Sequence, residues 1–203
     1  MLFYNADNPA PNPRRVRIFI AEKGIGLPTK SVSIIEREQK NPDYLAKNSL
    51  GQVPILELDD GTILAESVSI CRYLEALHPD PALFGRTPLE QAQIDMWNRR
   101  IEMQLQGPIG LFWRHAHPFT AKIIKQYTDF GQSNLENAQN AMRWLDKEFE
   151  GRDFIAGDAY TIADISALCA IDFATFIGID IPEECQALQA WHERVSQRPS
   201  AHA

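Results

Sequence analysis

Cysteine is scarce in this sequence, and long apolar runs are missing from it. Among 203 residues the cysteines are Cys71, Cys169 and Cys185, too few and too scattered for a disulfide framework, which is typical of a reducing compartment. No apolar run approaches the roughly 20 residues that a membrane-spanning helix needs, and a signal-peptide pattern is absent from the first residues. We therefore expect a cytoplasmic protein without a membrane partner.

Basic residues are fewer than acidic ones: the sequence has 20 Lys and Arg and 27 Asp and Glu, which gives a formal net charge of −7. This balance disfavours a sequence-independent grip on nucleic acid, and we expect no nucleic-acid partner. Metal-ligand clusters are lacking too, because His115 and His117 are two residues apart and would splay across a helix, so we expect no metal. What remains is an ordinary globular composition, long enough for one large or two small domains.

The first 79 residues carry the signals of a small α/β domain. Asn12 offers an N-cap, Pro13 suits the first helical position, and Gly24 is typical of a helix end. In chain order the pattern predicts a strand at 2–4, a helix between 12 and 24, a strand at 32–34, a hairpin over 55–64 that turns at 59–61, and a helix capped by Ser67. Tyr4, in the first strand, is interpreted as a packing residue.

The remainder reads as helical. Residues 80–88 are rich in proline and predict a linker, and residues 89–203 predict an all-helical domain with helices at 89–106, 121–150, 161–178 and 183–197. Thr161 and Asp164 have the spacing of a capping box. We therefore interpret Asp164 as structural rather than catalytic.

Gly51-Gln52-Val53-Pro54 precedes the first strand of the predicted hairpin. A proline here makes sense if the Val53–Pro54 bond is cis and forms a tight turn. Such a turn leaves the main-chain N–H and C=O of Val53 open to a peptide-like ligand, which would pair with them as a strand edge does.

Glu66 and Ser67 follow the hairpin directly, where the next helix begins. A helix N-terminus attracts an anion, and Glu66 beside it would attract a cation. Carboxylate and ammonium together are the head group of an α-amino acid. The alternative is an ordinary helix start, in which Ser67 caps the helix and Glu66 only complements its dipole.

The segment "NSLGQVPILELDDGTILAESVSICRYLE" resembles the amino-terminal domain of soluble glutathione transferases, and "AGDAYTIADISAL" and "LQAWHERVSQRPS" resemble the helical domain of that family. "NPRRVRIFIAEKGI" and "MWNRRIE" are similar to a fungal and bacterial subgroup. The resemblance implies a thioredoxin-like α/β domain, an all-α domain, a homodimer and glutathione as co-substrate. It further implies a set of glutathione contacts: Glu66 and Ser67 for the γ-glutamyl head, Val53 and Pro54 for the cysteinyl unit, and Gln39, Lys40 and Gln52 near the glycyl carboxylate or the peptide backbone.

One departure from the family concerns the loop from Asn5 to Pro13. Most members place a Tyr, Ser or Cys there to hold the glutathione sulfur, and here the position falls near Ala10 with no hydroxyl beside it. Lowering a thiol pKa from ~8.5 by roughly two units requires about 2.7 kcal/mol. The N-terminus of the first helix contributes up to ~2 kcal/mol and a charged donor ~1.5–3 kcal/mol. The candidate donors are Arg14, the Asn12 side chain and a bound water. The alternative for Arg14 and its neighbour Arg15 is solvated helix surface.

The resemblance also implies that a helix ending near His115 lines the cleft opposite this loop. His115 would then hold a water or accept a proton near neutral pH, whereas the plainer interpretation is a histidine that flanks a helix end. Phe112, Trp113 and Phe119 are candidates for an apolar electrophile pocket, although aromatic residues at helical spacing are more often core.

The sequence thus favours a glutathione transferase that conjugates the thiolate of glutathione to small hydrophobic electrophiles. A non-catalytic glutathione-binding module is the first alternative, favoured by the missing hydroxyl. A glutathione-dependent thiol reductase is the second, and it ranks last because the first loop has no cysteine.

Overall fold

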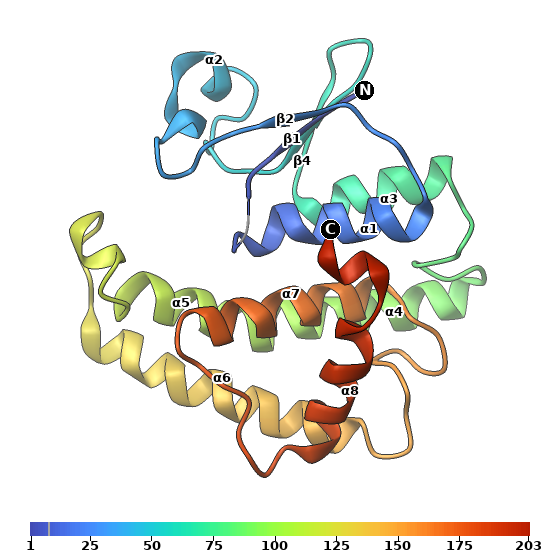
Figure 1. The fold of residues 1–203 in the computed structure, drawn as a ribbon, viewed down its shortest axis with the longest axis vertical. Coiled ribbons are helices and arrows are strands. Elements are labelled where there is room, and N and C mark those ends of the chain that lie inside the picture. The colour runs from blue at the N-terminus through green and yellow to red at the C-terminus, as the bar shows by residue number, and fades with distance from the viewer. Residues whose placement is uncertain (8) are drawn as a thin grey trace. The chain divides into compact units, whose positions relative to one another are not determined.

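The structure is a computed structural model that describes residues 1–7 and 9–203. It divides into two compact units (Figure 1). The first unit comprises Met1–Leu83 with Pro199–Ala203, and the second comprises Phe84–Arg198. The division falls inside the segment expected as a linker, and the last five residues group with the α/β unit although the sequence assigned them to the helical part.

The first unit is built on a four-stranded sheet in the order β2-β1-β3-β4. Its strands are β1 (Leu2–Asn5), β2 (Thr29–Ser31), β3 (Ile55–Glu57) and β4 (Ile63–Ala65). β1 pairs with β2 in parallel and with β3 antiparallel, and β3 and β4 form the predicted hairpin. The fold is therefore the mixed α/β domain that the sequence predicted.

The second strand lies earlier than predicted. The alternation around residues 32–34 suggested a strand there, but β2 ends at Ser31. All three residues of this edge strand are exposed, so pairing with β1 rather than burial of alternate side chains places it. Val32 is buried just beyond the strand, where its N–H donates to the Asn5 carbonyl at 2.7 Å.

Helix α1 (Pro11–Lys23) begins before the predicted cap. Its N-cap is Ala10, which makes no side-chain capping bond, so the assignment of Asn12 as N-cap was wrong. Asn12 lies inside the first turn, and its amide oxygen accepts from Arg15. The predicted end at Gly24 is confirmed, with φ 63° in the left-handed region that suits glycine.

Helix α3 (Ser67–Leu77) also begins differently. Ser67 is its first helical residue and the N-cap is Glu66, without a side-chain capping bond, so the prediction that Ser67 caps the helix was wrong. The reason is a competing partner, since the Ser67 hydroxyl accepts from Arg15.

The sheet is covered on both faces, with α1 and α3 on one side and the short α2 (Pro42–Leu45) on the other (Figure 1). Side chains along a strand alternate between the faces. Tyr4 and Ile55 accordingly join Val32 and Tyr44 in one buried cluster. The 3₁₀ helices of this unit are η1 (Glu38–Lys40), which leads into α2, and η4 (Pro199–His202), which packs on α1.

The second unit is helical. Its elements are α4 (Pro88–Arg100), the π-helical stretch η2 (Ile101–Gln106), α5 (Gly107–His115), the 3₁₀ helix η3 (Thr120–Lys122), α6 (Thr128–Glu148), α7 (Ile162–Phe176) and α8 (Gln186–Ser196). The predicted helix from residue 121 starts only at Thr128, because residues 116–127 form turns and the short η3 instead. There the Thr120 hydroxyl donates to the Trp113 carbonyl at 2.6 Å and the Gln126 amide to the His117 carbonyl at 2.8 Å.

Helix α7 is the core of this unit. Its N-terminus carries the predicted capping box: the Thr161 hydroxyl accepts from the Ala163 N–H, and Asp164 accepts from the Thr161 N–H at 2.9 Å. Asp164 is fully buried and also accepts from the Trp191 indole at 3.0 Å, which ties α7 to α8. Its structural interpretation is confirmed.

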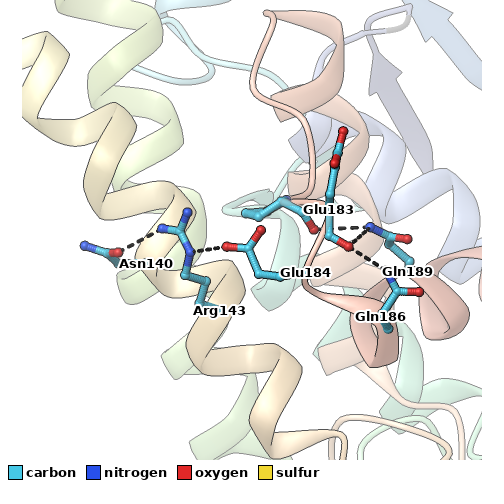
Figure 2. A network of polar contacts seen from close by, with 7 residues as sticks. Asn140, Arg143, Glu183, Glu184, Gln186 and Gln189 are labelled. Carbon is cyan, nitrogen blue, oxygen red and sulfur yellow. Dashed lines mark hydrogen bonds and ion pairs between the residues drawn. The ribbon is translucent and has the colours of Figure 1, made fainter.

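A polar network joins α6 to the segment before α8 (Figure 2). Arg143 donates to Glu184 at 2.7 Å and to Asn140 at 3.1 Å, and the Glu183 carbonyl accepts from Gln189 at 3.4 Å. These residues lie at the surface, where such pairs contribute little to stability. No helix within residues 1–7 and 9–203 is long and apolar enough to cross a membrane.

Candidate functional site

Three segments that the sequence singled out meet at one end of the sheet. The strand register pairs Tyr4 with Ile55 and Ile55 with Ala65. One step beyond these pairs, β1 enters the first loop, the Val53–Pro54 turn enters β3, and β4 leaves for Glu66. The first loop, the proline turn and the start of α3 are therefore neighbours at the same edge of the first unit.

The Val53–Pro54 bond is cis, as predicted. Among residues 1–7 and 9–203 the main-chain N–H and C=O of Val53 have no hydrogen-bond partner. The preceding carbonyl, of Gln52, is held by the Tyr44 hydroxyl at 2.8 Å and the Asn48 amide at 2.9 Å. Two donors thus fix the turn from α2 and the residues after it, and the Val53 main chain stays open.

Gly51 brings the loop of Gln39 and Lys40 against this turn. It has φ 56°, and a Cβ at this position would lie 2.7 Å from the Gln39 carbonyl and 2.8 Å from Lys40 Nζ. Lys40 donates to the Leu50 carbonyl at 3.0 Å. The amide oxygen of Gln39 is buried, and no described residue donates to it. Gln39, Lys40 and Gln52, which the sequence grouped by resemblance, therefore do lie together.

Glu66 and Ser67 stand next to each other with opposite exposure. Glu66 is exposed and has φ 65° and ψ 116°, a conformation unusual for a residue with a side chain, which costs about 1–3 kcal/mol. Ser67 is only 5% exposed. The strained Glu66 places an acidic side chain at the surface, beside a helix start whose hydroxyl is buried.

Arg15 is the residue that sequence reasoning missed. It is 1% exposed, and its Nη1 donates to Ser67 Oγ at 2.6 Å and to Asn12 Oδ1 at 3.2 Å. The interpretation as solvated surface was wrong. A signal was present, because Arg15, Ile18 and Phe19 share the i, i+3, i+4 spacing of a buried helix face, and all three are buried.

Arg14 is half-buried rather than solvated, and its guanidinium donates to the Ala201 carbonyl at 3.0 Å. Ser200 in the same C-terminal segment contacts the carboxylate of Glu22. Both contacts hold η4 against α1. Arg14 thus has a structural partner within the first unit, and no local pattern around Arg14 predicts this contact with the C-terminal segment.

The first loop is fixed by Arg17, which donates to the Asn5 side chain and to the Ala6 carbonyl, both at 2.7 Å. At the start of α1, Pro11 and Pro13 have no N–H, so Asn12 supplies the one main-chain donor among the first three helical residues. The first three residues of this helix can therefore offer only one main-chain N–H group to a bound thiolate. Asn8 of the predicted loop lies outside the described residues.

Tyr4 lies in the buried core of the first unit, in the cluster against which Val53 packs. It is 5% exposed, and its hydroxyl donates to Glu57 at 2.6 Å. The hydrogen bond to Glu57, with burial second, raises the pKa of Tyr4. Its ring packs edge-on against Tyr44, with centroids 6.1 Å apart.

His115 belongs to the second unit, as the last residue of α5. Its ring lies 5.7 Å from that of Tyr127 and 5.6 Å from that of Phe130, measured between centroids. Its Nδ1 is buried, with no hydrogen-bond partner among the residues the structure describes. Gly131 makes the approach of α6 possible, because a Cβ there would lie 2.6 Å from the His115 backbone.

Aromatic side chains gather beside the end of α5. The ring centroid of Trp113 lies 5.4 Å from that of Phe119, 4.4 Å from that of His117 and 5.5 Å from that of Phe173. Phe119 is 55% exposed, so part of this cluster is surface rather than core. The second unit thus presents aromatic surface of its own.

Within residues 1–7 and 9–203, no group of three or more His, Cys, Asp or Glu is placed to hold a metal ion. The three cysteines are all buried, and none of them forms a disulfide with another described residue. Burial raises the pKa of Cys185, which disfavours its thiolate.

Comparison with known proteins gives a consistent picture. Residues 10–77 match the family described as glutathione S-transferase, N-terminal domain, and residues 116–199 match glutathione S-transferase, C-terminal domain. The chain is 40% identical to glutathione S-transferase 2 of Saccharomyces cerevisiae, across 98% of this chain and 87% of that one. It is 28% identical to a maleylacetoacetate isomerase of Pseudomonas aeruginosa, across 93% and 86%. The crystal structure of Gtt2 from Saccharomyces cerevisiae superposes with a TM-score of 0.92 at 38% identity, covering 100% of this chain and 99% of that one.

Proposed function

Because this chain belongs to the glutathione S-transferase family, we propose that it conjugates the thiolate of glutathione to small hydrophobic electrophiles. The tripeptide lies extended along the turn, pairing with the Val53 main chain next to Pro54. Its γ-glutamyl head rests on Glu66 and Ser67. The proposal rests on the Val53 main chain, whose N–H and C=O make no hydrogen bond with another described residue. Val53 precedes β3, which pairs with β4, and β4 leads directly to the start of α3.

The glycyl end of glutathione has a basic and amide environment in the same unit. Lys40 is exposed and lies against Gly51, with the buried amide oxygen of Gln39 beside it. We assign the glycyl carboxylate to Lys40, and the peptide backbone to Gln39 and Gln52. A carboxylate paired with an ammonium group supplies a charge-assisted hydrogen bond.

In this proposal the glutathione thiol ionises without a Tyr or Ser hydroxyl or a Cys thiol from the first loop. The Asn12 N–H at the start of α1 stabilises a thiolate as a hydrogen-bond donor at a helix end. His115 is the proposed acceptor of the thiol proton, since histidine is the most frequent general base. Arg14 is a weaker candidate donor, because its guanidinium is engaged by Ala201.

The electrophile is apolar in this proposal. Support comes from the exposed aromatic surface of the second unit, where Phe119 is 55%, Tyr127 57% and Phe130 49% exposed. Aromatic faces bind flat apolar molecules by stacking.

Two measurements test the proposed function together: titration of glutathione by calorimetry, and turnover of a reactive aryl halide in the presence of glutathione. The proposal expects saturable binding and a rate well above the uncatalysed reaction. Binding without turnover would instead support the non-catalytic glutathione-binding module. A thiol reductase would reduce a mixed disulfide of glutathione, and the first loop has no cysteine to do so.

We also propose a cytoplasmic homodimer. The support for dimerisation is an apolar stripe at seven-residue spacing, formed by Leu89 and Met96 on α4 and Met103 in η2, which are 68%, 40% and 60% exposed. Leu89 and Met96, seven residues apart on α4, lie on nearly the same side of that helix, and Met103 follows in the π-helical stretch η2. A second copy of the chain is the proposed occupant of this stripe.

A further inference from the structure

We propose that Arg15 is a positioning residue for the amino-acid head of glutathione, acting through the Ser67 hydroxyl. The inference rests on the proposed function and adds a group that neither the sequence motif nor the family resemblance assigned. Its basis is a buried guanidinium in direct contact with the residue expected to bind the γ-glutamyl carboxylate.

The chemistry of the two side chains fixes the direction of their hydrogen bond. A guanidinium has only donors, whereas a hydroxyl has one donor and two acceptor lone pairs. At 2.6 Å from Arg15 Nη1, the Ser67 oxygen must therefore be the acceptor. Its own proton points elsewhere, and within residues 1–7 and 9–203 nothing accepts it.

A buried donor without an acceptor is costly unless a ligand supplies one. Ser67 is 5% exposed and stands as the first residue of α3, where a helix end favours an anion. The acceptor that fits is a carboxylate oxygen. Arg15 thus keeps the Ser67 hydroxyl turned outward as a donor and adds positive charge one hydrogen bond behind it.

Asn12 completes the arrangement. Its amide oxygen accepts from the same Arg15 nitrogen at 3.2 Å, so the guanidinium is held between the start of α1 and the start of α3. The two helices that flank the proposed glutathione site are thereby joined by one side chain. A change at Arg15 should be felt at the head group and not at the glycyl end.

The test compares two ligands: glutathione, and the analogue in which γ-aminobutyryl replaces γ-glutamyl, so that the α-carboxylate is absent and the ammonium group is kept. Arg15→Met should weaken glutathione binding about 10- to 100-fold, the range expected for a hydrogen bond to a charged group. Affinity for the analogue should not change. KM for glutathione should rise by the same factor while kcat at saturation stays within about twofold.

Coupling to Ser67 distinguishes positioning from a general structural role. Ser67→Ala should produce a loss similar to that of Arg15→Met, and the double variant should be hardly weaker than either single variant. Ser69→Ala, an exposed position on the same helix, is the control and should bind both ligands as the parent does. Additive losses in the double variant, or equal losses for both ligands, would overturn the proposal.

Arg15→Lys serves if the methionine variant does not fold. A lysine keeps the charge and loses the planar fork, so we expect a loss of about 3- to 10-fold for glutathione and none for the analogue. An equal effect on both ligands would again refute positioning. If the parent itself binds glutathione no better than the analogue, the head-group assignment fails instead, which separates that outcome from a failure at Arg15.

Discussion

Glu66 is the N-cap of α3 and is exposed at the edge of the first unit where the first loop, the proline turn and α3 are neighbours. Its backbone is held at φ 65°, a conformation that glycine adopts at little cost. An ordinary side chain is therefore kept at a strained position, where it offers a negative charge beside the start of α3. In the proposed site that charge faces the ammonium group of glutathione.

Glu66 can be tested with a pair of substitutions. Glu66→Ala and Glu66→Gly both remove the carboxylate, so both should weaken glutathione binding, by about tenfold or more. Only glycine relieves the backbone strain, so its variant should be more stable than the alanine variant by about 1 kcal/mol. Calorimetry and urea denaturation measure the two effects. Unchanged affinity in both variants would refute the assignment of the ammonium group.

His115 is predicted to act on rate rather than on binding. His115→Ala should lower turnover about 100-fold, the lower end of general acid–base contributions, while glutathione affinity changes little. His117, two residues away, has its Nδ1 engaged by the Phe119 N–H, so His117→Ala is the matched control. Steady-state kinetics measure both variants. Equal losses of turnover in the two variants would mean that His115 has only a structural role.

The Tyr44 hydroxyl donates a hydrogen bond to the Gln52 carbonyl and so stabilises the proline turn. Burial raises the pKa of Tyr44 to about 12. The hydroxyl therefore stays protonated and keeps donating throughout the range from pH 6 to 10. We expect Tyr44→Phe to reduce stability by about 1 kcal/mol and to weaken glutathione binding several-fold. The ratio of parent to variant affinities should be constant over that pH range, and a ratio that falls toward pH 10 would contradict this.

At the scale of elements, the sequence predicted what local chemistry determines. The Asp59–Gly61 turn, the Gly24 helix end, the cis Val53–Pro54 bond and the capping box of α7 all follow from the residues at those positions. The sequence-based predictions were wrong where a residue far away in the chain determines the local structure. Ser67 is not a cap because Arg15, 52 positions away, takes its oxygen, and β2 is placed by β1 rather than by its own alternation.

The same distinction applies to the candidate site. Val53, Glu66 and Ser67 could be singled out as candidates because the turn and the helix start are local features. Arg15 was missed because burial of a guanidinium is decided by tertiary contacts, and an arginine in an isolated sequence is most often exposed. The engagement of Arg14 by Ala201 is likewise a contact across 187 positions.

The capping box of α7 gives a prediction with a definite sign. Burial raises the pKa of Asp164 to about 6, against the lowering effect of its hydrogen bonds from Ile155, Thr161 and Trp191. Its folded pKa exceeds the unfolded value of about 3.9, so the folded state binds the extra proton between these values. The stability contributed by this group is therefore greatest below pH 4 and falls as pH rises through 6.

Asp164→Asn removes this titration. We expect the variant to be less stable than the parent, because an amide cannot accept from all the donors that surround the carboxylate. The difference in unfolding free energy should shrink by up to about 3 kcal/mol from pH 4 to pH 7. Denaturant titrations at several pH values measure it. A difference that grows with pH would mean that hydrogen bonding outweighs burial at Asp164.

At the scale of the whole molecule, the stripe of Leu89, Met96 and Met103 is the feature to test. Met96→Glu combined with Met103→Glu should convert a dimer to monomers, because two like charges would face their copies across a desolvated contact. Light scattering after size exclusion reports the mass. Gln132→Glu with Asn137→Asp adds the same charge to exposed positions on α6, and this control should leave the mass unchanged.

The placement of residues 199–203 beside α1 bears on how chimaeras of this protein should be cut. A chimaera that takes only residues 1–83 from one parent would lack the matching C-terminal segment, which Arg14 and Glu22 contact through Ala201 and Ser200. The unit that can be exchanged is discontinuous in sequence, so a chimaera between relatives should take residues 199–203 from the same parent as residues 1–83. A fluorophore attached near Ala203 would, for the same reason, report on the thioredoxin-like part and not on the helices that precede it in the chain.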